Sequence, residues 1–261
     1  MTDPGPLALR ALTDAPAGLL TDLDGTLAPI VSDPSAVRPV PGAAEALGAL
    51  AARLTVVGVV TGRAALDARR IVGRDDLLVV GNHGLEWLAP GASSAEPTPN
   101  ASAQAAGVER AASAVPSEPG VVVERKGLSA TVHVRASPDP GAARERARAA
   151  VARAAPEVDL RPGRMSLEIR PRGAGDKGTA AHAVVERFAL RGLVVLGDDV
   201  TDLDMFRAVA DLRAAGRLRG AILAVRGGRE VPAEVAAAAD AVIGSPEEVV
   251  ALLIELAAEL P

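Results

Sequence analysis

Short apolar runs alternate with amphipathic segments in two blocks of the chain. In the first third the pattern reads, in order, GLLTDLD, AAEALGALAARL, TVVGVV, RAALDARRIVG and LLVVGN. Near the end it returns as KGTAAHAVVERFAL, LVVLGDD, DLDMFRAVADLRAAG, AILAV and a helical segment from about residue 246. Strands that alternate with helices in this way predict a parallel sheet in an α/β domain. We expect the two blocks to be halves of one sheet.

The middle of the chain follows a different pattern. Its residues alternate with period two, as half-buried antiparallel strands do, in VVVERKG and LSATVHVR. A helix and a further strand are expected in AARERARAAVARAA and MSLEIR. Segments rich in proline and glycine flank this region at 90–100 and 171–175, and such composition is typical of linkers.

Together these patterns predict an α/β fold in which a Rossmann-like parallel-sheet core carries an inserted α+β cap domain. We place the core at residues 1–98 and 173–261 and the cap at residues 99–172. An insertion that is joined at two flexible points can close over a site like a lid.

Composition narrows the classes of function. With one Trp, two Phe and no Tyr among 261 residues, the aromatic platforms that stack nucleic-acid bases are missing. The net charge of −5 disfavours nucleic acid and anionic membrane as partners, and an anionic substrate needs a local positive site. The absence of cysteine excludes disulfides, a thiolate nucleophile and a zinc–thiolate site. Without a basic, apolar leader or a run of about 18 apolar residues, we expect a soluble cytoplasmic protein.

The stretch LLTDLDGT places two carboxylates where a buried strand ends. Because ligands of open α/β sheets bind at the carboxyl edge, Asp22 and Asp24 can converge on one point there. Gly25 lets the backbone approach a ligand closely, and Thr26 offers a hydroxyl. An Asx turn without a catalytic role, or a calcium-binding loop, explains this motif equally well when it is taken alone.

A second acidic group follows the strand LVVLG. Asp198, Asp199 and Asp202 come directly after it, and so many carboxylates at the ends of two strands repel one another without a cation. Magnesium prefers such hard oxygen ligands, and manganese accepts them too. The alternative, in which Asp202 and Asp204 only start a helix, suits Asp202 but not Asp198 and Asp199 together.

Two further positions offer partners for a phosphate group. The strand TVVGVV ends in Thr61-Gly62-Arg63, where a hydroxyl, backbone N–H groups and a helix N-terminus come together. Lys177 opens a helix after a glycine-rich loop and is a candidate to neutralise a nucleophile and a phosphate. The plain alternatives are a threonine helix cap and a surface lysine.

The order DLDGT, TGR, a lysine that opens a helix, and GDDVTD resembles the haloacid dehalogenase superfamily of phosphatases. The resemblance implies that Asp22 is the nucleophile that forms an aspartyl-phosphate and that Asp24 is the general acid and base. It also implies phosphate binding by Thr61 and Lys177. The implied magnesium site consists of Asp22, Asp198 and the main-chain carbonyl of Asp24, with Asp199 and Asp202 in support.

Additional blocks narrow the resemblance to the trehalose-6-phosphate phosphatases: DLDGTLAPI, GNHGLE, VVVERKG, TVHVR, SLEIRP, DKGTA and GDDVTDLDMF, between residue 20 and about residue 206. This family implies Mg²⁺-dependent release of trehalose from trehalose 6-phosphate, the last step of trehalose biosynthesis, and a functional link to a trehalose-phosphate synthase. The substrate contacts that it implies are Gly62, Arg63, Asn82, His83, Gly84, Glu124, Lys126 and Glu168.

The lid residues have a physical reading of their own. Glu124 and Lys126 are two positions apart, hence on one face of a strand, and such charged groups suit the hydroxyls of a sugar. A solvated strand face of mixed charge is the plain alternative. His83 is compatible with an ordinary turn, and we interpret His133 as structural.

Two other hypotheses for the function stay open. A related capped phosphatase acting on sucrose phosphate, mannosylphosphoglycerate or a hexose phosphate is the nearest. A sensor of sugar phosphates without catalytic activity, or a regulatory partner of the synthase, is more remote, because a pure binder does not need a nucleophile.

Overall fold

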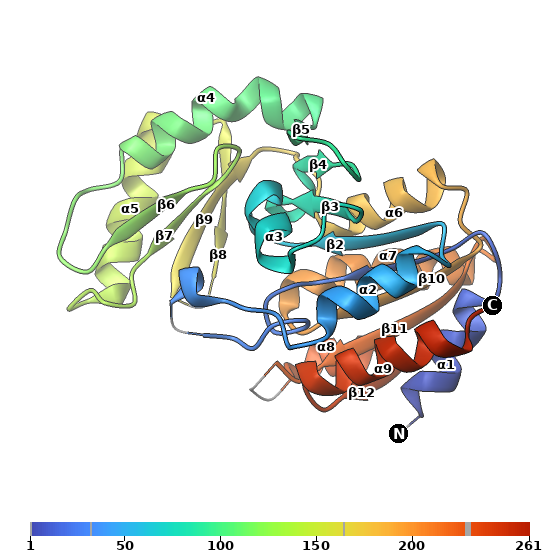
Figure 1. Ribbon diagram of the computed structural model, residues 1–261. Helices are drawn as coiled ribbons and strands as arrows, with labels where there is room; N and C mark the ends of the chain where they lie inside the picture. The colour runs from blue at the N-terminus through green and yellow to red at the C-terminus, as the bar shows by residue number, and fades with distance from the viewer. Residues whose placement is uncertain (1, 32, 164, 228–230) are drawn as a thin grey trace. The chain divides into compact units, whose positions relative to one another are not determined.

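The computed structural model describes residues 2–31, 33–163, 165–227 and 231–261 (Figure 1). The chain divides into two compact units, which we call the core unit (Met1–Ala95 and Gly175–Pro261) and the cap unit (Glu96–Ala174). From the sequence alone we expect the cap at residues 99–172. No helix among the described residues is both long and apolar enough to cross a membrane.

A mainly parallel sheet forms the middle of the core unit. Its strands are β1 (Ala17–Thr21), β2 (Val56–Val60), β3 (Leu78–Gly81), β4 (Glu86–Leu88), β10 (Gly192–Gly197), β11 (Arg219–Val225) and β12 (Ala241–Ile243). They lie in the order β12-β11-β10-β1-β2-β3-β4, and only β4 pairs antiparallel with its neighbour, β3. Because β1 pairs with β10, the two blocks of the sequence meet in one sheet, which confirms the predicted α/β architecture.

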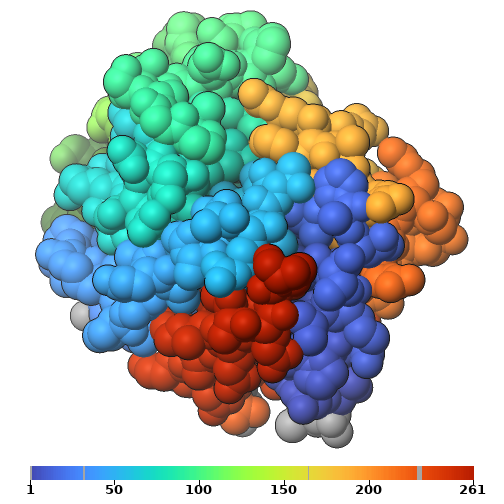
Figure 2. All heavy atoms as spheres, turned by 45° about the vertical axis from the view of Figure 1, so that its right-hand side comes forward, coloured from blue at the N-terminus to red at the C-terminus, as the bar shows by residue number. Residues whose placement is uncertain are grey.

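Helices cover both faces of this sheet, which explains why its strands are continuous apolar runs. One face packs against α1 (Pro4–Leu12), α2 (Ala43–Ala51), α3 (Ala65–Val72) and α9 (Pro246–Glu259). The other packs against α6 (Lys177–Arg187), α7 (Leu203–Ala214) and α8 (Ala233–Ala238). Figure 2 shows the red C-terminal helix between the dark blue N-terminal segment and the light blue region near residue 50. The described residues of this unit also form three short 3₁₀ turns: η1 (Pro34–Ala36), η2 (Asn82–Gly84) and η3 (Val200–Asp202).

The cap unit has an antiparallel sheet with helices on one face. The strands β6 (Val122–Arg125), β7 (Ala130–His133), β9 (Ser166–Pro171) and β8 (Val158–Pro162) lie in that order. The apolar face of the sheet packs against α4 (Pro99–Ser113) and α5 (Pro140–Ala154). A two-residue strand, β5 (Glu96–Pro97), begins the unit.

Two elements of the cap unit are not predicted by the sequence patterns, the helix α4 and the strand β8. The end of the expected linker at 90–100 already belongs to α4, because Thr98 caps the backbone N–H of Ala101 and Pro99 occupies the first helical turn. In α4 the buried side chains are mostly alanine, so its apolar stripe is too weak to stand out in the sequence.

Candidate active site

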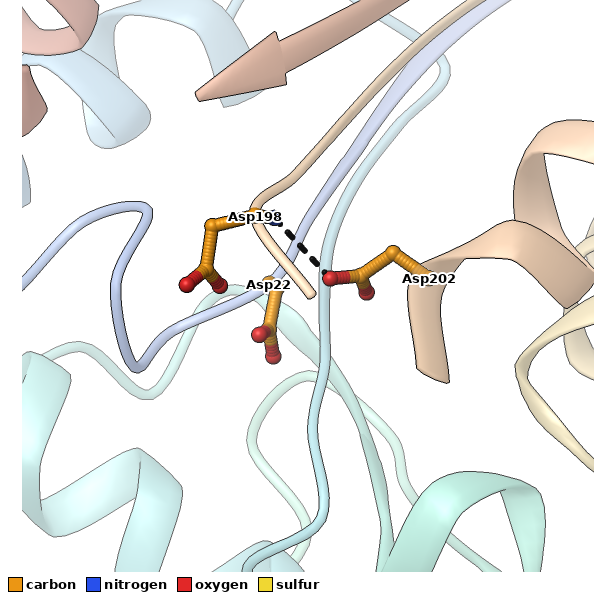
Figure 3. A group of neighbouring side chains, drawn as sticks. All are labelled: Asp22, Asp198 and Asp202. Carbon is orange, nitrogen blue, oxygen red and sulfur yellow. Dashed lines mark hydrogen bonds between the residues drawn. The ribbon is translucent and has the colours of Figure 1, made fainter. Parts of the chain in front are cut away.

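Three aspartates gather at the carboxyl edge of the core sheet. Asp22 follows β1, and its backbone N–H donates to the carbonyl of Leu196 in β10 at 2.9 Å. Asp198 directly follows β10, and Asp202 ends the next turn, η3. We call Asp22, Asp198 and Asp202 the acidic cluster; each offers one carboxylate oxygen within 4.8 Å of the others, and all three residues are buried (Figure 3). The carboxylates therefore converge because two adjacent parallel strands end side by side.

Lys177 supplies the positive charge of this cluster. It is the first residue of α6, which Asp176 and Thr179 begin with a reciprocal capping box. Its Nζ lies 3.0 Å from Oδ1 of Asp22 and 2.7 Å from Oδ1 of Asp202, and the side chain is only 2% exposed. The lysine that the sequence suggests as a neighbour of the acids is thus in direct contact with two of them.

Asp202 uses both of its oxygens within the protein. Oδ1 accepts a hydrogen bond from Lys177, and Oδ2 accepts from the backbone N–H groups of Asp198 at 3.0 Å and Asp199 at 3.1 Å. Figure 3 shows the bond to Asp198 as a dashed line. Asp202 therefore fixes the loop that carries Asp198. The side chain of Asp199 is exposed and is not part of the acidic cluster.

Burial and mutual repulsion shift the protonation of this group. Burial raises the pKa of Asp22 to about 7, against the opposing effect of Lys177 and with the help of Asp202 and Asp24. Burial also raises the pKa of Asp198 to about 9, and the charges of Asp22 and Asp202 add to it. For Lys177 burial alone lowers the pKa, but the charges of Asp202 and Asp22 outweigh it and raise that pKa above its ordinary value. One ammonium thus balances the buried carboxylates only in part.

The donor set fits a small divalent cation. Oδ1 of Asp198 is buried without a hydrogen-bond partner, which is costly for a carboxylate unless a cation binds it. The backbone at Gly25 comes so close, with φ +86°, that a Cβ there would lie 2.1 Å from Oδ2 of the same carboxylate. Carboxylate oxygens are the ligands that Mg²⁺ prefers in proteins, and Asp22 and Asp198 are the members of the cluster able to provide them.

The loop after β2 holds Thr61, Gly62 and Arg63. Arg63 makes a bidentate ion pair with Asp24, with Nε 2.7 Å from Oδ2 and Nη2 2.8 Å from Oδ1. The Thr61 side chain is buried, and its hydroxyl accepts from the backbone N–H of Arg63 at 3.3 Å. Arg63, which we expect near the phosphate and the sugar, is therefore in direct contact with Asp24, the expected general acid and base. No pattern in the sequence predicts this contact.

The turn Asn82-His83-Gly84 supports that loop from the end of β3. The backbone N–H of Asn82 donates to the carbonyl of Arg63 at 2.7 Å, and that of His83 donates to the carbonyl of Thr61 at 2.8 Å. Asn82 and His83 both have positive φ, 50° and 57°, a conformation uncommon outside glycine. At Gly84, with φ +106°, a Cβ would lie 2.6 Å from the carbonyl oxygen of Asp176. The turn thus contacts both the Thr61 loop and the residue before Lys177.

Glu86 is a functional candidate that the sequence reasoning did not assign. Its Oε1 accepts from the backbone N–H of Ala65, at the start of α3, at 2.7 Å and from Nδ2 of Asn82 at 2.8 Å. One carboxylate oxygen therefore joins the turn to the helix that follows the Thr61 loop. The signal lies in the block GNHGLE, whose last residue is this glutamate.

The expected lid residues share one face of the cap sheet. Glu124 pairs with Thr131 across β6 and β7, and Thr131 pairs with Glu168 across β7 and β9, so the three side chains form one row. Lys126, two residues after Glu124, has its Nζ 3.9 Å from Oε2 of Glu124. His133 lies on the same face, with Nε2 2.9 Å from that oxygen. We call these five residues the polar face; His133, interpreted as structural from the sequence, contacts a predicted substrate ligand.

Known proteins are similar to this chain in sequence and in fold. Residues 20–236 match the family model described as trehalose-phosphatase. The trehalose-phosphate phosphatase of Mycobacterium avium (strain 104) is 40% identical over 243 residues, 85% of this chain and 59% of the relative, so the chain spans little more than half of that protein.

Solved structures show the same architecture. The C-terminal domain of the C. albicans trehalose-6-phosphate phosphatase superposes with a TM-score of 0.75 at 22% identity, covering 97% of this chain and 96% of that one. A sugar phosphatase of the haloacid dehalogenase superfamily superposes with a TM-score of 0.51 at 18% identity, covering 89% and 95%. At these identities the structures establish the fold, a haloacid dehalogenase core with a cap.

Proposed function

The chain belongs to the trehalose-phosphatase family, and on this basis we propose that it hydrolyses trehalose 6-phosphate to trehalose and phosphate with Mg²⁺. The observation that carries the proposal is the placement of Asp22 against Lys177 and beside Asp198, whose buried Oδ1 has no hydrogen-bond partner. A carboxylate held beside an ammonium and a cation-binding group has what nucleophilic attack on an anionic phosphate ester needs. The reaction would be the last step of trehalose biosynthesis and would follow that of a trehalose-phosphate synthase.

In the first half of the proposed reaction, Asp22 attacks the phosphorus atom. An oxygen of its carboxylate forms a bond to phosphorus while the bond from phosphorus to the sugar oxygen breaks. Asp24 gives a proton to that leaving oxygen, and Lys177 and Thr61 bind the transferred phosphoryl group. Mg²⁺, when held by Asp22, Asp198 and the main-chain carbonyl of Asp24, supplies positive charge that offsets the carboxylates and the phosphate.

In the second half, water hydrolyses the aspartyl-phosphate. Asp24 takes a proton from the water, the water oxygen attacks phosphorus, and the bond from phosphorus to Asp22 breaks to release phosphate. Both oxygens of Asp24 accept a hydrogen bond from Arg63, and each keeps a second lone pair for the proton that Asp24 gives to the sugar oxygen or takes from the water. Arg63 thus holds the acid and base in place.

The cap unit provides the proposed sugar contacts. Glu124, Lys126 and Glu168 offer carboxylate and ammonium groups, which suit a neutral sugar rich in hydroxyls. Because Glu124 and Glu168 both flank Thr131 in one cross-strand row, they can bind hydroxyls of the same sugar. We propose that these contacts select the disaccharide and that closure of the cap over the substrate brings them into use.

Phosphate release from purified protein tests this function. Trehalose 6-phosphate, glucose 6-phosphate and sucrose 6-phosphate are each supplied with Mg²⁺ or with EDTA. We expect strong, Mg²⁺-dependent release from the trehalose ester alone. Preferred release from another ester would be consistent with the aspartate chemistry but would contradict the proposed substrate. Binding of the trehalose ester with Mg²⁺ but without turnover would contradict the proposal that the protein is an enzyme.

A further inference from the structure

An open groove lies at the edge of the core sheet where strands begin. It has a volume of about 540 Å³, and its lining includes Arg191, Arg213, Arg217, Arg219, Asp14 and Asp240. Arg191 precedes β10, Arg219 begins β11, and Asp240 precedes β12. We call this feature the arginine groove.

The arginine groove is remote from the acidic cluster. Parallel strands start at one edge of a sheet and end at the other, and β10 separates Arg191 from Asp198. At about 3.3 Å per residue, its six residues span about 20 Å. A ligand in the groove therefore takes no part in the reaction at Asp22.

The groove carries excess positive charge in a chain whose net charge is −5. Four arginines and two aspartates line it within the described part of the chain. Asp14 is 3.8 Å from Nε of Arg191 and 3.9 Å from Nε of Arg219, and these distances are long for ion pairs.

The other two arginines are engaged to different degrees. Arg213 forms a close pair with Asp240, with Nη1 and Oδ2 2.5 Å apart. Nη2 of Arg217 lies 3.8 Å from Oε1 of Glu186, a residue that does not line the groove. Arginines at this edge also complement the negative C-terminal end of α7, but a helix end carries only about half a charge. Asp14, Asp240 and Glu186 together offset the charge of the four guanidinium groups only in part.

We propose that the arginine groove binds a small phosphorylated anion. Guanidinium groups match the oxygens of a phosphate with paired hydrogen bonds, and they serve this purpose better than ammonium groups do. The long contacts of Arg217 and Arg219 leave these two side chains able to turn toward such a ligand, whereas Nε of Arg191 donates a hydrogen bond to the carbonyl of Ala15 at 2.7 Å. The groove is open to solvent, and its volume of about 540 Å³ has room for a small anion.

Isothermal titration calorimetry with inorganic pyrophosphate tests the proposal. EDTA is present throughout, because without a cation the acidic cluster repels an anion at the reaction site. The test variant is Arg217→Gln with Arg219→Gln, whose side chains make only the long contacts above. The control is Arg70→Gln with Arg148→Gln, which changes the net charge equally and removes the exposed pairs with Asp67 and Glu145. Thermal unfolding verifies that both variants are folded.

We expect the wild-type chain to bind one pyrophosphate and the test variant to bind it at least about tenfold more weakly. The control should bind as the wild type does. Absence of binding to the wild type at millimolar pyrophosphate would overturn the proposal. So would unchanged affinity in the test variant, or an equal loss in the control, since these results would indicate another site or a general effect of charge.

Discussion

The acidic cluster of the core unit and the polar face of the cap unit both combine carboxylates with a lysine, yet they differ in burial. Lys177 is 2% exposed and lies within 3.0 Å of two carboxylates. In the polar face the side chain of Lys126 is 15% exposed and that of Glu124 is 43% exposed, and their contact is 3.9 Å long. The chain has only these two lysines, and its other cationic side chains are arginines or histidines.

This difference in burial corresponds to two different functions that we expect of the two regions. In the acidic cluster each charge depends on its neighbours, because water does not screen them, and removal of one charge alters the others. On the polar face the side chains of Glu124 and His133 remain partly hydrated, so these groups can change at small cost to the fold. From this comparison we predict that the core unit carries out the chemistry, which is the same for all phosphate esters. We predict that the cap unit selects the sugar.

The largest expected effect is that of Asp22→Asn. The amide keeps the shape of the side chain but cannot form the phosphoryl bond, so turnover should fall at least about 10⁴-fold. The loss should be the same for trehalose 6-phosphate and for an aryl phosphate, since both need the nucleophile. Phosphate release and thermal unfolding would be measured together; a folded variant that retains turnover would show that Asp22 is not the nucleophile.

Replacing each lysine by methionine compares the stability of the two regions. Lys177→Met leaves Asp22 and Asp202 buried without their counter-charge, which should cost about 3–5 kcal/mol of the free energy of unfolding. In the matched change Lys126→Met the neighbouring carboxylate of Glu124 is 43% exposed, so water can solvate it, and the cost should be at most about 1 kcal/mol. Denaturant unfolding of both variants measures the difference. Equal costs would contradict the contrast between the two regions.

Stability without metal should depend on pH through the acidic cluster. Because the pKa values of Asp22 and Asp198 are raised to about 7 and about 9, the folded chain holds more protons than the unfolded chain above about pH 4. The stabilising protonated forms are lost as pH rises through the folded pKa values, so in EDTA the unfolding temperature should fall between pH 5 and pH 9. Asp198→Asn, which stays neutral, should make this fall smaller. An unfolding temperature that rises over this range in EDTA would contradict the assignment.

The smallest effect in the core unit is expected at Glu86, which contacts neither Asp22 nor Lys177 in the structure. Glu86→Ala removes the acceptor shared by Ala65 and Asn82 and should lower kcat about tenfold by loosening the Thr61 loop. Glu86→Gln keeps an oxygen in that place and should recover most of kcat, with KM little changed in both variants. If Gln and Ala behaved alike, Glu86 would not position the loop through this oxygen.

The sequence predicts the core unit well, because its signals are local. Apolar runs that end in Asp22 and Asp198 mark adjacent strand ends, and parallel pairing brings them together without further information. The start of α6 likewise places Lys177 at the same edge. The cap unit is harder to predict, since the buried alanines of α4 give a weak periodicity.

Contacts between distant side chains lie beyond sequence patterns. The pair of Arg63 with Asp24 depends on rotamers 39 residues apart in the chain. The contact of His133 with Glu124 depends on the strand register, although the alternation in TVHVR already places Thr131 and His133 on one face. The arginine groove collects residues from the helices α1 and α7 and from four separate loops or strand starts, so no single segment of the sequence signals it.

The most direct test of the division between chemistry and selection is the ratio of two kcat/KM values in Glu124→Ala. Trehalose 6-phosphate and p-nitrophenyl phosphate are compared, with Glu109→Ala, an exposed carboxylate of α4 paired with Arg125, as the control. We predict a loss of about 100-fold on the sugar ester, less than about twofold on the aryl ester, and no change for the control. Equal losses on both esters would contradict the assignment of sugar selection to the polar face.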